Sequence, residues 1–392
     1  MLFLGCLFDR EKEKEIMSLS NSGLMNASNT FEWNLIDGLS ENLKKPVDII
    51  NVLPVGTYPK SYKKLFLKTF NWSYKGSRNT EIGCINLPFI KQFMRTVALK
   101  KAIKQKNDKN IIIYSTYLPF LKAIKNLDKS YHITLIVTDL PEYYDLAKTS
   151  GVRRALRNIY NKMVYKCLER VDDFVILTEQ MKEPLKIGSR RYVVVEGISN
   201  STEFPKDVEK SDKKAILYTG TLNYKFGIKT LLDAFLMIQG DEYELWICGS
   251  GEAKEEIEHL SKKDKRIKYF GYLPKEEIQK LQKCASLLIN PRSNEGEYTK
   301  YSFPSKTIEY MQSSTPVLMH KLAGIPEEYS EYLYYFEGNT KDDVKNKIIE
   351  VLAKPEEERS AFGENARRFI IDKKNPAVQA GKILNLIGEN LN

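Results

Sequence analysis

Residues 294–311, NEGEYTKYSFPSKTIEYM, place acidic, hydroxyl and basic side chains where a loop is expected to enter a helix. Pro304 suits the first helical turn, and Ser305 and Glu309 then share one helix face. The unpaired N–H groups at the helix start, with Ser305 and Lys306, suit an anion. The Glu309 carboxylate can accept from two neighbouring hydroxyls, as in a ribose. This spacing fits a nucleoside diphosphate, and it fits a capped amphipathic helix with a solvated Glu309 equally well.

Two glycine-containing turns also lead into segments expected to be helices, as the loop before Pro304 does. In 218–227, YTGTLNYKFG, and in 248–252, CGSGE, an apolar run ends in glycine and a helix-like segment follows. Glycine lets the backbone turn tightly and approach a ligand, but an ordinary strand-to-helix turn reads the same way. The candidate ligand contacts in these turns are Gly220, Thr221, Asn223, Gly249 and Gly251.

The elements that must position these residues alternate along the chain. Short β-branched or apolar runs such as NIIIYST and HITLIVTD are separated by helical stretches such as 88–106 and 152–170. Continuous apolar strands that alternate with helices are typical of doubly wound α/β domains with parallel sheets. Ligands of such sheets bind outside the carboxyl ends of the strands.

The alternation is interrupted once. Residues 200–214, NSTEFPKDVEKSDKK, are polar and charged and predict a linker, after which the pattern restarts. We therefore expect one domain over 1–204 and a second over 205–372. The last helix, over about 373–392, is expected to pack back on the first domain.

Composition narrows the class of protein. The 392 residues are 42% hydrophobic and 29% charged, a globular balance that suits two domains. Five scattered cysteines form no Cys-x-x-Cys pair, and three histidines lie far apart, so neither a disulfide scaffold nor a metal site is expected. Residues 1–8 read as a first strand, and no apolar run reaches the length of a membrane-spanning helix. A cytoplasmic protein is expected.

An ordered series of motifs resembles a known family. GTL, GIKTLLDAF, ELWICGSGE, IKYFGYLPKEEIQKLQKCASLLINP and FPSKTIEYMQSSTPVL follow one another within residues 215–360. This series resembles the donor domain of the family 4 glycosyltransferases. NSGLMNASNTFEWNLIDGL (21–39) and VTDLPEYYD (137–145) resemble the acceptor domain of bacterial members that build surface polysaccharides. The resemblance implies a GT-B fold, with two Rossmann-like domains facing a central cleft.

The resemblance also implies roles for the acids. The family's Glu-x7-Glu motif ends at Glu309, which should contact the ribose of the donor. Its first acid belongs eight residues earlier, where this chain has Tyr301. The Glu295-Gly296 pair copies a family dipeptide but lies fourteen residues before Glu309, outside the register. Donor specificity is therefore expected to have changed at Tyr301.

The cations that would hold the diphosphate are also changed. The family commonly has Arg at the position of Thr221 and Lys at that of Phe226. The nearest substitutes are Arg292, Lys300 and Lys306. By resemblance, Tyr272 and Leu273 are also expected to contact the donor. The family's histidine, which would approach the donor sugar, aligns with Thr138, and the adjacent Asp139 is the candidate for its role. The catalytic candidates are Asp139, Tyr301 and Lys306.

On the acceptor side, the loop 20–29 is rich in small polar residues and precedes a helix expected to start near Thr30. Gly23 and Asn26 could touch acceptor or phosphate there, although an ordinary loop before a helix has the same composition.

The net charge of +10 is concentrated in the N-terminal half. Residues 60–109 contain thirteen Lys or Arg and two acids, and residues 148–170 contain seven and one. In 60–78 and 88–106 these cations are mixed with aromatic residues, which is typical of a peripheral membrane surface. Core packing of the stripe Phe89, Phe93 and Val97 is the ordinary alternative.

We thus expect a retaining, metal-independent glycosyltransferase at the inner face of the cell membrane. It would use a nucleotide diphosphate-sugar and a polyprenyl-diphosphate-linked glycan acceptor, with no cofactor and no nucleic acid. The alternatives are a nucleotide-sugar epimerase of the same fold and a basic nucleic-acid-binding protein.

Overall fold

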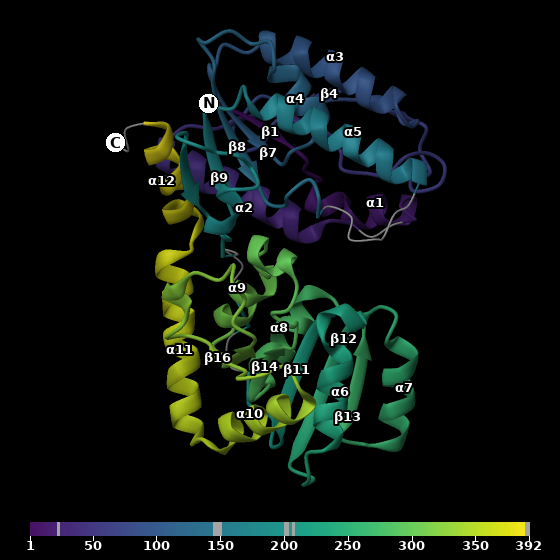
Figure 1. The fold of residues 1–392 in the computed structure, drawn as a ribbon, viewed down its shortest axis with the longest axis vertical. Helices are drawn as coiled ribbons and strands as arrows, with labels where there is room; N and C mark the ends of the chain where they lie inside the picture. Colours follow the sequence, from purple (N-terminus) through teal and green to yellow (C-terminus); the bar gives the residue numbers. More distant parts are fainter. Residues whose placement is uncertain (22–23, 144–150, 200–203, 206–207, 389–392) are drawn as a thin grey trace. The chain divides into compact units, whose positions relative to one another are not determined.

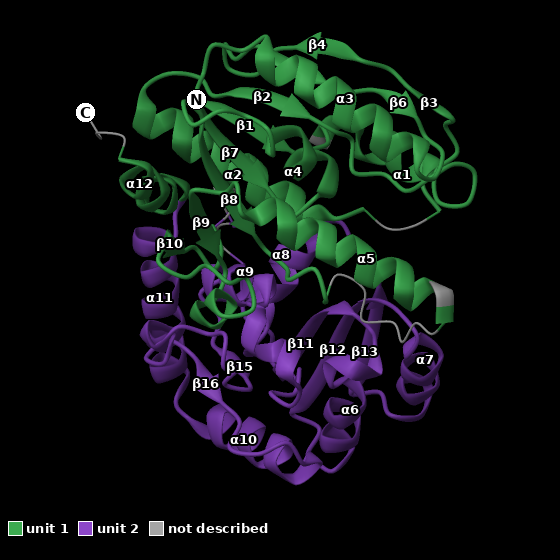
Figure 2. Ribbon diagram, turned by 45° about the horizontal axis from the view of Figure 1, so that its top comes forward, with its two compact units in different colours: residues 1–198, 376–392 green, residues 199–375 purple. Residues whose placement is uncertain are grey.

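The computed structural model describes residues 1–392 except 22–23, 144–150, 200–203, 206–207 and 389–392. The chain forms two compact units (Figure 2). Unit 1 comprises Met1–Ile198 and Pro376–Asn392, and unit 2 comprises Ser199–Asn375. The division after residue 198 lies six residues before the expected one, and the returning segment starts at Pro376 instead of residue 373.

Unit 1 contains an eight-stranded sheet in the order β10-β9-β8-β7-β1-β2-β5-β4, in which β4 alone runs antiparallel to its neighbour. The strands are β1 (Leu2–Gly5), β2 (Asp48–Asn51), β4 (Phe70–Trp72), β5 (Asn79–Glu81), β7 (Asn110–Tyr114), β8 (His132–Val137), β9 (Asp173–Ile176) and β10 (Arg191–Val194). A small antiparallel pair, β3 (Phe66–Leu67) with β6 (Cys84–Ile85), lies outside it. The central strands are buried along their length, as their continuous apolar runs predict.

Helices cover both faces of this sheet (Figure 1). On one side α2 packs against α12, and on the other α4 packs against both α3 and α5. The unit-1 helices are η1 (Arg10–Lys12), α1 (Glu13–Leu19), α2 (Asn26–Leu43), α3 (Ile90–Lys104), α4 (Leu118–Ile124), α5 (Gly151–Leu168), η2 (Glu179–Lys182) and α12 (Pro376–Ile387). The prediction that α2 starts near Thr30 is wrong, because the helix begins at Asn26. Its first helical hydrogen bond runs from the Asn29 N–H to the carbonyl of Met25, the N-cap.

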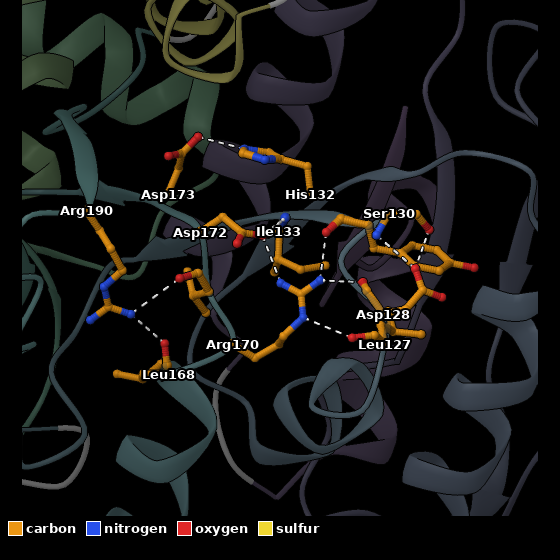
Figure 3. Close-up of polar contacts among 12 residues, drawn as sticks. Leu127, Asp128, Ser130, His132, Ile133, Leu168, Arg170, Asp172, Asp173 and Arg190 are labelled. Atoms are coloured by element: carbon orange, nitrogen blue, oxygen red, sulfur yellow. Dashed lines mark hydrogen bonds and ion pairs between the residues drawn. The ribbon is translucent and has the colours of Figure 1, made fainter.

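A buried arginine fastens the amino ends of the unit-1 strands (Figure 3). Arg170 donates from Nε to the Leu127 carbonyl at 3.2 Å and from Nη1 to the Asp172 carboxylate at 2.9 Å. Its Nη2 donates to the Asp128 and Tyr131 carbonyls at 2.9 and 2.7 Å. One side chain thus joins the turn before β8 to the turn before β9, at the sheet edge away from the strands' carboxyl ends.

Unit 2 contains a six-stranded parallel sheet in the order β13-β12-β11-β14-β15-β16. Its strands are β11 (Lys214–Thr221), β12 (Tyr243–Ser250), β13 (Ile267–Gly271), β14 (Leu287–Asn290), β15 (Val317–Met319) and β16 (Tyr334–Tyr335). This is the strand order of dinucleotide-binding Rossmann domains, in which the direction of winding reverses between the first and fourth strands. Here the reversal falls between β11 and β14.

The alternating side chains of β11 explain why helices cover both faces of the unit-2 sheet. Ile216 packs with residues of α6, α7 and α10, and Leu217 packs with residues of α9 and α11. The unit-2 helices are η3 (Tyr224–Phe226), α6 (Ile228–Leu236), α7 (Lys254–Lys263), α8 (Lys275–Cys284), η4 (Glu297–Tyr301), α9 (Ser305–Gln312), η5 (Glu327–Tyr329), α10 (Lys341–Ala353) and α11 (Glu356–Lys373). Thr340 caps α10 through a reciprocal pair of hydrogen bonds with Asp343.

Among the residues that the structure describes, none of the helices combines the length and the apolar character needed to cross a bilayer.

Candidate functional site

The candidate site residues of unit 2 gather at the carboxyl ends of β11 and β14, where the winding reverses. Gly220 and Thr221 end β11, Arg292 follows β14 by two residues, and α9 starts after the loop that continues from Arg292. In sheets of this kind the crevice at the reversal is where ligands bind.

Helix α9 is held against β11 by the buried Tyr310. Its hydroxyl accepts from Thr219 N–H at 2.8 Å and donates to the Thr219 carbonyl at 3.1 Å. This bond places the first turn of α9 beside Gly220, and a Cβ added at Gly220 would lie 3.5 Å from Cε of Lys306. The prediction that Pro304 lies in the first helical turn is wrong. Pro304 is the N-cap of α9, with an extended backbone, and the helix starts at Ser305.

Lys306 and Glu309 form the charged centre of the site. Lys306 Nζ lies 3.5 Å from one carboxylate oxygen of Glu309, and Gln282 Nε2 of α8 donates to the other at 2.7 Å. Burial raises the pKa of the Glu309 carboxyl, but Lys306 and Gln282 outweigh it and lower the pKa overall. Since 35% of its side chain is exposed, Glu309 is an ionised acceptor that a ligand can reach.

Arg292 lies over Phe226, the residue that stands where a family lysine was expected. Its guanidinium carbon is 5.8 Å from the Phe226 ring centroid and 5.0 Å from that of Tyr298. Its Nη2 donates to the Ser302 hydroxyl at 3.0 Å, while its buried Nε has no hydrogen-bond partner among the described residues. The structure therefore places a cation from the loop after β14 beside the aromatic ring that replaces the lysine.

The glycines of the second turn have a packing role. A Cβ added at Gly249, whose φ is +136°, would lie 1.8 Å from the Gly220 carbonyl oxygen, and one at Gly251 would lie 2.5 Å from that of Leu222. The ends of β11 and β12 thus pack backbone against backbone, so these two glycines bring the loops together. Their expected contact with a donor stays a prediction.

The other donor-side candidates lie around the same edge. Thr221 is exposed, and the Asn223 side chain accepts from Lys225 N–H at 3.0 Å and so caps η3, the ordinary alternative for that turn. Tyr272 is exposed just after β13, and Leu273 packs partly into the core shared with α9. The exposed Ser305 is the first residue of α9.

Residues before α9 form a separate group. Tyr301 ends η4, half-buried, with its hydroxyl 3.5 Å from the Glu297 carboxylate, and Lys300 beside it is exposed. Asn339, in the loop before α10, donates to the Glu295 carboxylate at 3.5 Å. Glu295 and Glu309 therefore have different neighbours, one in the loop before α10 and the other on α8.

Of the three candidate residues in unit 1, one lies at the carboxyl edge of the sheet, where it was expected. Asp139 lies two residues after β8, at the carboxyl edge of the unit-1 sheet, and is half-buried. Asn26 is in the first turn of α2, not in a loop, and donates to the Glu13 carboxylate at 2.9 Å. Gly23 lies outside the described residues.

Sequence reasoning missed two residues that organise the site, Tyr310 and Gln282. Tyr310 was within the quoted stretch, but an apolar face with a tyrosine reads as core packing. Gln282 is fully buried on α8, and a glutamine on the apolar face of an amphipathic helix was the available signal.

Comparison with known proteins concerns unit 2 most directly. Residues 199–369 match the family model of glycosyl transferases group 1. An uncharacterized glycosyltransferase of Methanocaldococcus jannaschii is 27% identical over 122 residues, which are 30% of this chain and 30% of that protein. The matched region includes the whole site described above, from Gly220 to Glu309.

Solved structures match over the whole chain. Sucrose-phosphate synthase from Thermosynechococcus elongatus superposes with a TM-score of 0.69 at 16% identity, covering 99% of this chain and 98% of the other. WaaG, a glycosyltransferase involved in lipopolysaccharide biosynthesis, gives 0.63 at 12%, covering 99% and 100%. Anabaena HepE, solved with UDP and glucose, gives 0.61 at 12%, covering 99% of both chains. The chain thus has the GT-B fold with two Rossmann-like domains, and its residues 199–369 are matched by the glycosyl transferases group 1.

Proposed function

We propose that this protein is a glycosyltransferase that takes a sugar from a nucleotide diphosphate-sugar. The observation that carries the proposal is the position of Lys306 and Glu309 on α9, at the winding reversal of a domain matched by glycosyl transferases group 1. That match favours a glycosyltransferase over the epimerase and the nucleic-acid-binding alternatives.

The donor would bind along α9. Glu309, held by Gln282, would accept from the ribose hydroxyls, and Lys306 with the first N–H groups of α9 would bind the diphosphate. Arg292 beside Phe226 would supply the second cation, since charge-assisted contacts are the strong ones for phosphate. UDP is present in the HepE structures to which this fold is similar, which supports a donor of this class.

These cations would also serve the chemistry. As the bond from sugar to diphosphate breaks, negative charge develops on the leaving phosphate, and in this proposal Lys306 and Arg292 would stabilise that charge without a metal. Tyr301, in the position of the family's first acid, would set which donor sugar is accepted. Retention of configuration is part of the proposal, and Asp139 is the candidate in unit 1 for a contact with the sugar.

The acceptor would be a lipid-linked glycan of the polyprenyl diphosphate type, in the building of a bacterial surface polysaccharide. The support is the resemblance of residues 21–39 and 137–145 and the fold shared with WaaG. Because such an acceptor lies in a membrane, the enzyme would work peripherally at the anionic inner face of the cell membrane through its basic N-terminal segments.

A thermal-shift panel tests the donor part. A nucleoside diphosphate at 100 times its Kd should stabilise unit 2 by about 2.7 kcal/mol. We expect one base to raise Tm more than the others and inorganic phosphate to leave it unchanged. Identical, negligible shifts for every nucleoside diphosphate and nucleotide sugar would contradict the proposal.

A further inference from the structure

The first two turns of helix α3 present apolar side chains to solvent and cations to the interior. Phe89, at the N-cap, is 81% exposed, and Phe93 and Val97 on the same stripe are 71% and 53% exposed. On the inner side, Lys91 is only 7% exposed and Arg95 only 2%. The ordinary alternative for this stripe, packing into the core, is therefore wrong.

The inverted orientation is fixed by specific contacts. Arg95 Nη2 donates to the Leu53 carbonyl at 2.9 Å and its Nη1 donates to the Tyr117 hydroxyl at 3.1 Å. The Lys91 ammonium donates to the Val55 carbonyl in the same loop. Rolling α3 to bury its phenylalanines would break these bonds, so the apolar stripe is held outward.

The outer stripe continues into a basic region. Lys101 follows Val97 by four residues, and Lys100 and Lys104 flank it, all exposed. Residues 90–104 contain no acid. A line of aromatic and aliphatic groups that leads into lysines is the pattern of helices that lie in the bilayer interface, with the lysines at the headgroups.

Helix α5 repeats this composition on the same side of the sheet. Its residues 151–168 also contain no acid. Leu156 and Ile159 are more than half exposed, and the neighbouring Arg153 and Arg154 are exposed too. Helix α4 packs between α3 and α5, so all three belong to one layer (Figures 1 and 2). We define the docking face as Phe89, Phe93, Val97, Lys100, Lys101 and Lys104 of α3 with Leu156 and Ile159 of α5.

We propose that the docking face binds an anionic lipid bilayer, with the phenylalanines in the interface and the lysines at the headgroups. The positive charge of this face favours a bilayer over a second copy of the chain. A second copy would set one acid-free basic face against another, which like-charge repulsion disfavours, whereas an anionic bilayer complements both the cations and the exposed rings. The docking face would bring the enzyme to the membrane that holds its lipid-linked acceptor, so its role rests on the function proposed above.

Vesicle co-sedimentation tests the docking face on the full chain. The probes are vesicles of pure phosphatidylcholine and of phosphatidylcholine with 30% phosphatidylglycerol, roughly a bacterial anionic content. Lys100→Glu with Lys101→Glu should weaken binding to the anionic vesicles by roughly 30-fold or more, because each lysine contributes a factor of about five. Phe93→Gln with Val97→Gln should weaken it by about tenfold.

Matched controls lie in unit 2. Lys262→Glu with Lys263→Glu reverses two exposed lysines of α7, and Leu236→Gln removes an exposed leucine of α6. Both should bind vesicles like the parent chain. Equal loss in the controls, or binding that does not depend on phosphatidylglycerol, would overturn the docking face.

Three further readouts separate the possible failures. The thermal shifts that nucleoside diphosphates cause should be the same in the α3 variants as in the parent chain. If the parent chain shows no such shift but still binds vesicles, the proposed function fails and the docking face stands. Sedimentation equilibrium that shows a dimer lost in Phe93→Gln with Val97→Gln would assign the face to a second copy instead. Binding to duplex DNA as tight as to vesicles, lost in the same variants, would assign it to nucleic acid.

Discussion

Glu309, the acid proposed for the donor site, was chosen from the sequence, but the residue that holds its carboxylate was not. Helical spacing set Glu309 on the same face as Ser305, and the family register excluded Glu295. The structure adds Gln282, whose amide fixes one carboxylate oxygen of Glu309 from a helix that starts thirty residues before α9. Pairings between distant helices leave no local pattern, so sequence reasoning missed this one.

Glu309→Gln should lower sugar transfer by about a hundredfold or more while leaving Tm within about 1 °C of the parent. The amide keeps the shape but loses the charge that attracts hydroxyl donors and pairs with Lys306. Glu295→Gln is the control and should retain most activity. Equal losses from the two variants would show that the register of the acids is wrong.

A buried acid in unit 1 makes stability depend on pH. Glu32 of α2 is fully buried, one of its carboxylate oxygens accepts from Cys6 N–H at 2.8 Å, and the other has no partner among the described residues. Burial raises the pKa of Glu32 well above its ordinary value, so the folded protein binds a proton that the unfolded chain releases. Stability must therefore fall as pH rises from the unfolded pKa towards the folded one.

Glu32→Gln should remove this fall, because glutamine keeps an acceptor for Cys6 and cannot ionise. At pH 7 we expect the variant to be more stable than the parent by roughly 1 kcal/mol or more, with the difference vanishing near pH 4. Urea unfolding at several pH values measures it. Glu41→Gln, an exposed position on the same helix, should change neither value. A parent chain whose stability rises over this range relative to Glu32→Gln would contradict the account.

At the scale of elements, the period of apolar residues predicted most strands and helices but not the orientation of α3. The pattern Phe89, Phe93, Val97 is indistinguishable in sequence from a core stripe. The loop carbonyls that bind Lys91 and Arg95 turn these two cations inward in the first two turns of α3, and no pattern in the sequence shows those contacts. Helix α4 has seven residues, six of them buried, and α11 is rich in charge, so neither has an apolar period clear enough to predict the helix.

The attachment of α9 to β11 should matter to both stability and donor binding. Tyr310→Phe removes the hydroxyl that serves Thr219 and leaves a buried N–H and carbonyl less well satisfied, at a cost of about 1–3 kcal/mol. Nucleoside diphosphate binding should also weaken, because α9 carries Lys306 and Glu309. Tyr224→Phe removes a hydroxyl that an exposed tyrosine donates to the Glu256 carboxylate, and it should leave both properties nearly unchanged. Unaltered stability in Tyr310→Phe would show that this bond does not hold α9.

The arginine at the amino ends of the unit-1 strands should be a purely structural residue. Arg170→Ala removes the donor of three carbonyls and one of the two donors to Asp172, and should cost about 3 kcal/mol. Arg367→Ala removes an exposed ion pair with Glu364 on α11 and should cost at most about 1 kcal/mol. Chemical denaturation compares the two, and similar costs would contradict the role assigned to Arg170.

At the scale of the whole molecule, the sequence predicted two doubly wound domains, because continuous apolar strands alternate with helices on both sides of the linker. It did not predict the order of strands, which depends on which edges pair. That order places the winding reversal of unit 2 between β11 and β14 and so brings Gly220, Arg292 and α9 to one edge. The residue types suggested the chemistry proposed for the site, whereas the way these residues come together could be seen only from the order of strands in the sheet.

Sugar transfer into a lipid phase tests the central claim most directly. A panel of radiolabelled nucleotide sugars would be incubated with the protein and a bacterial polyprenol-linked glycan extract, then partitioned into organic solvent. The account predicts that one donor labels the organic phase with the parent chain, that Glu295→Gln does so too, and that Glu309→Gln reduces the label by about a hundredfold. A parent chain that binds nucleoside diphosphates but transfers no sugar from any donor, or transfer unaffected by Glu309→Gln, would contradict it.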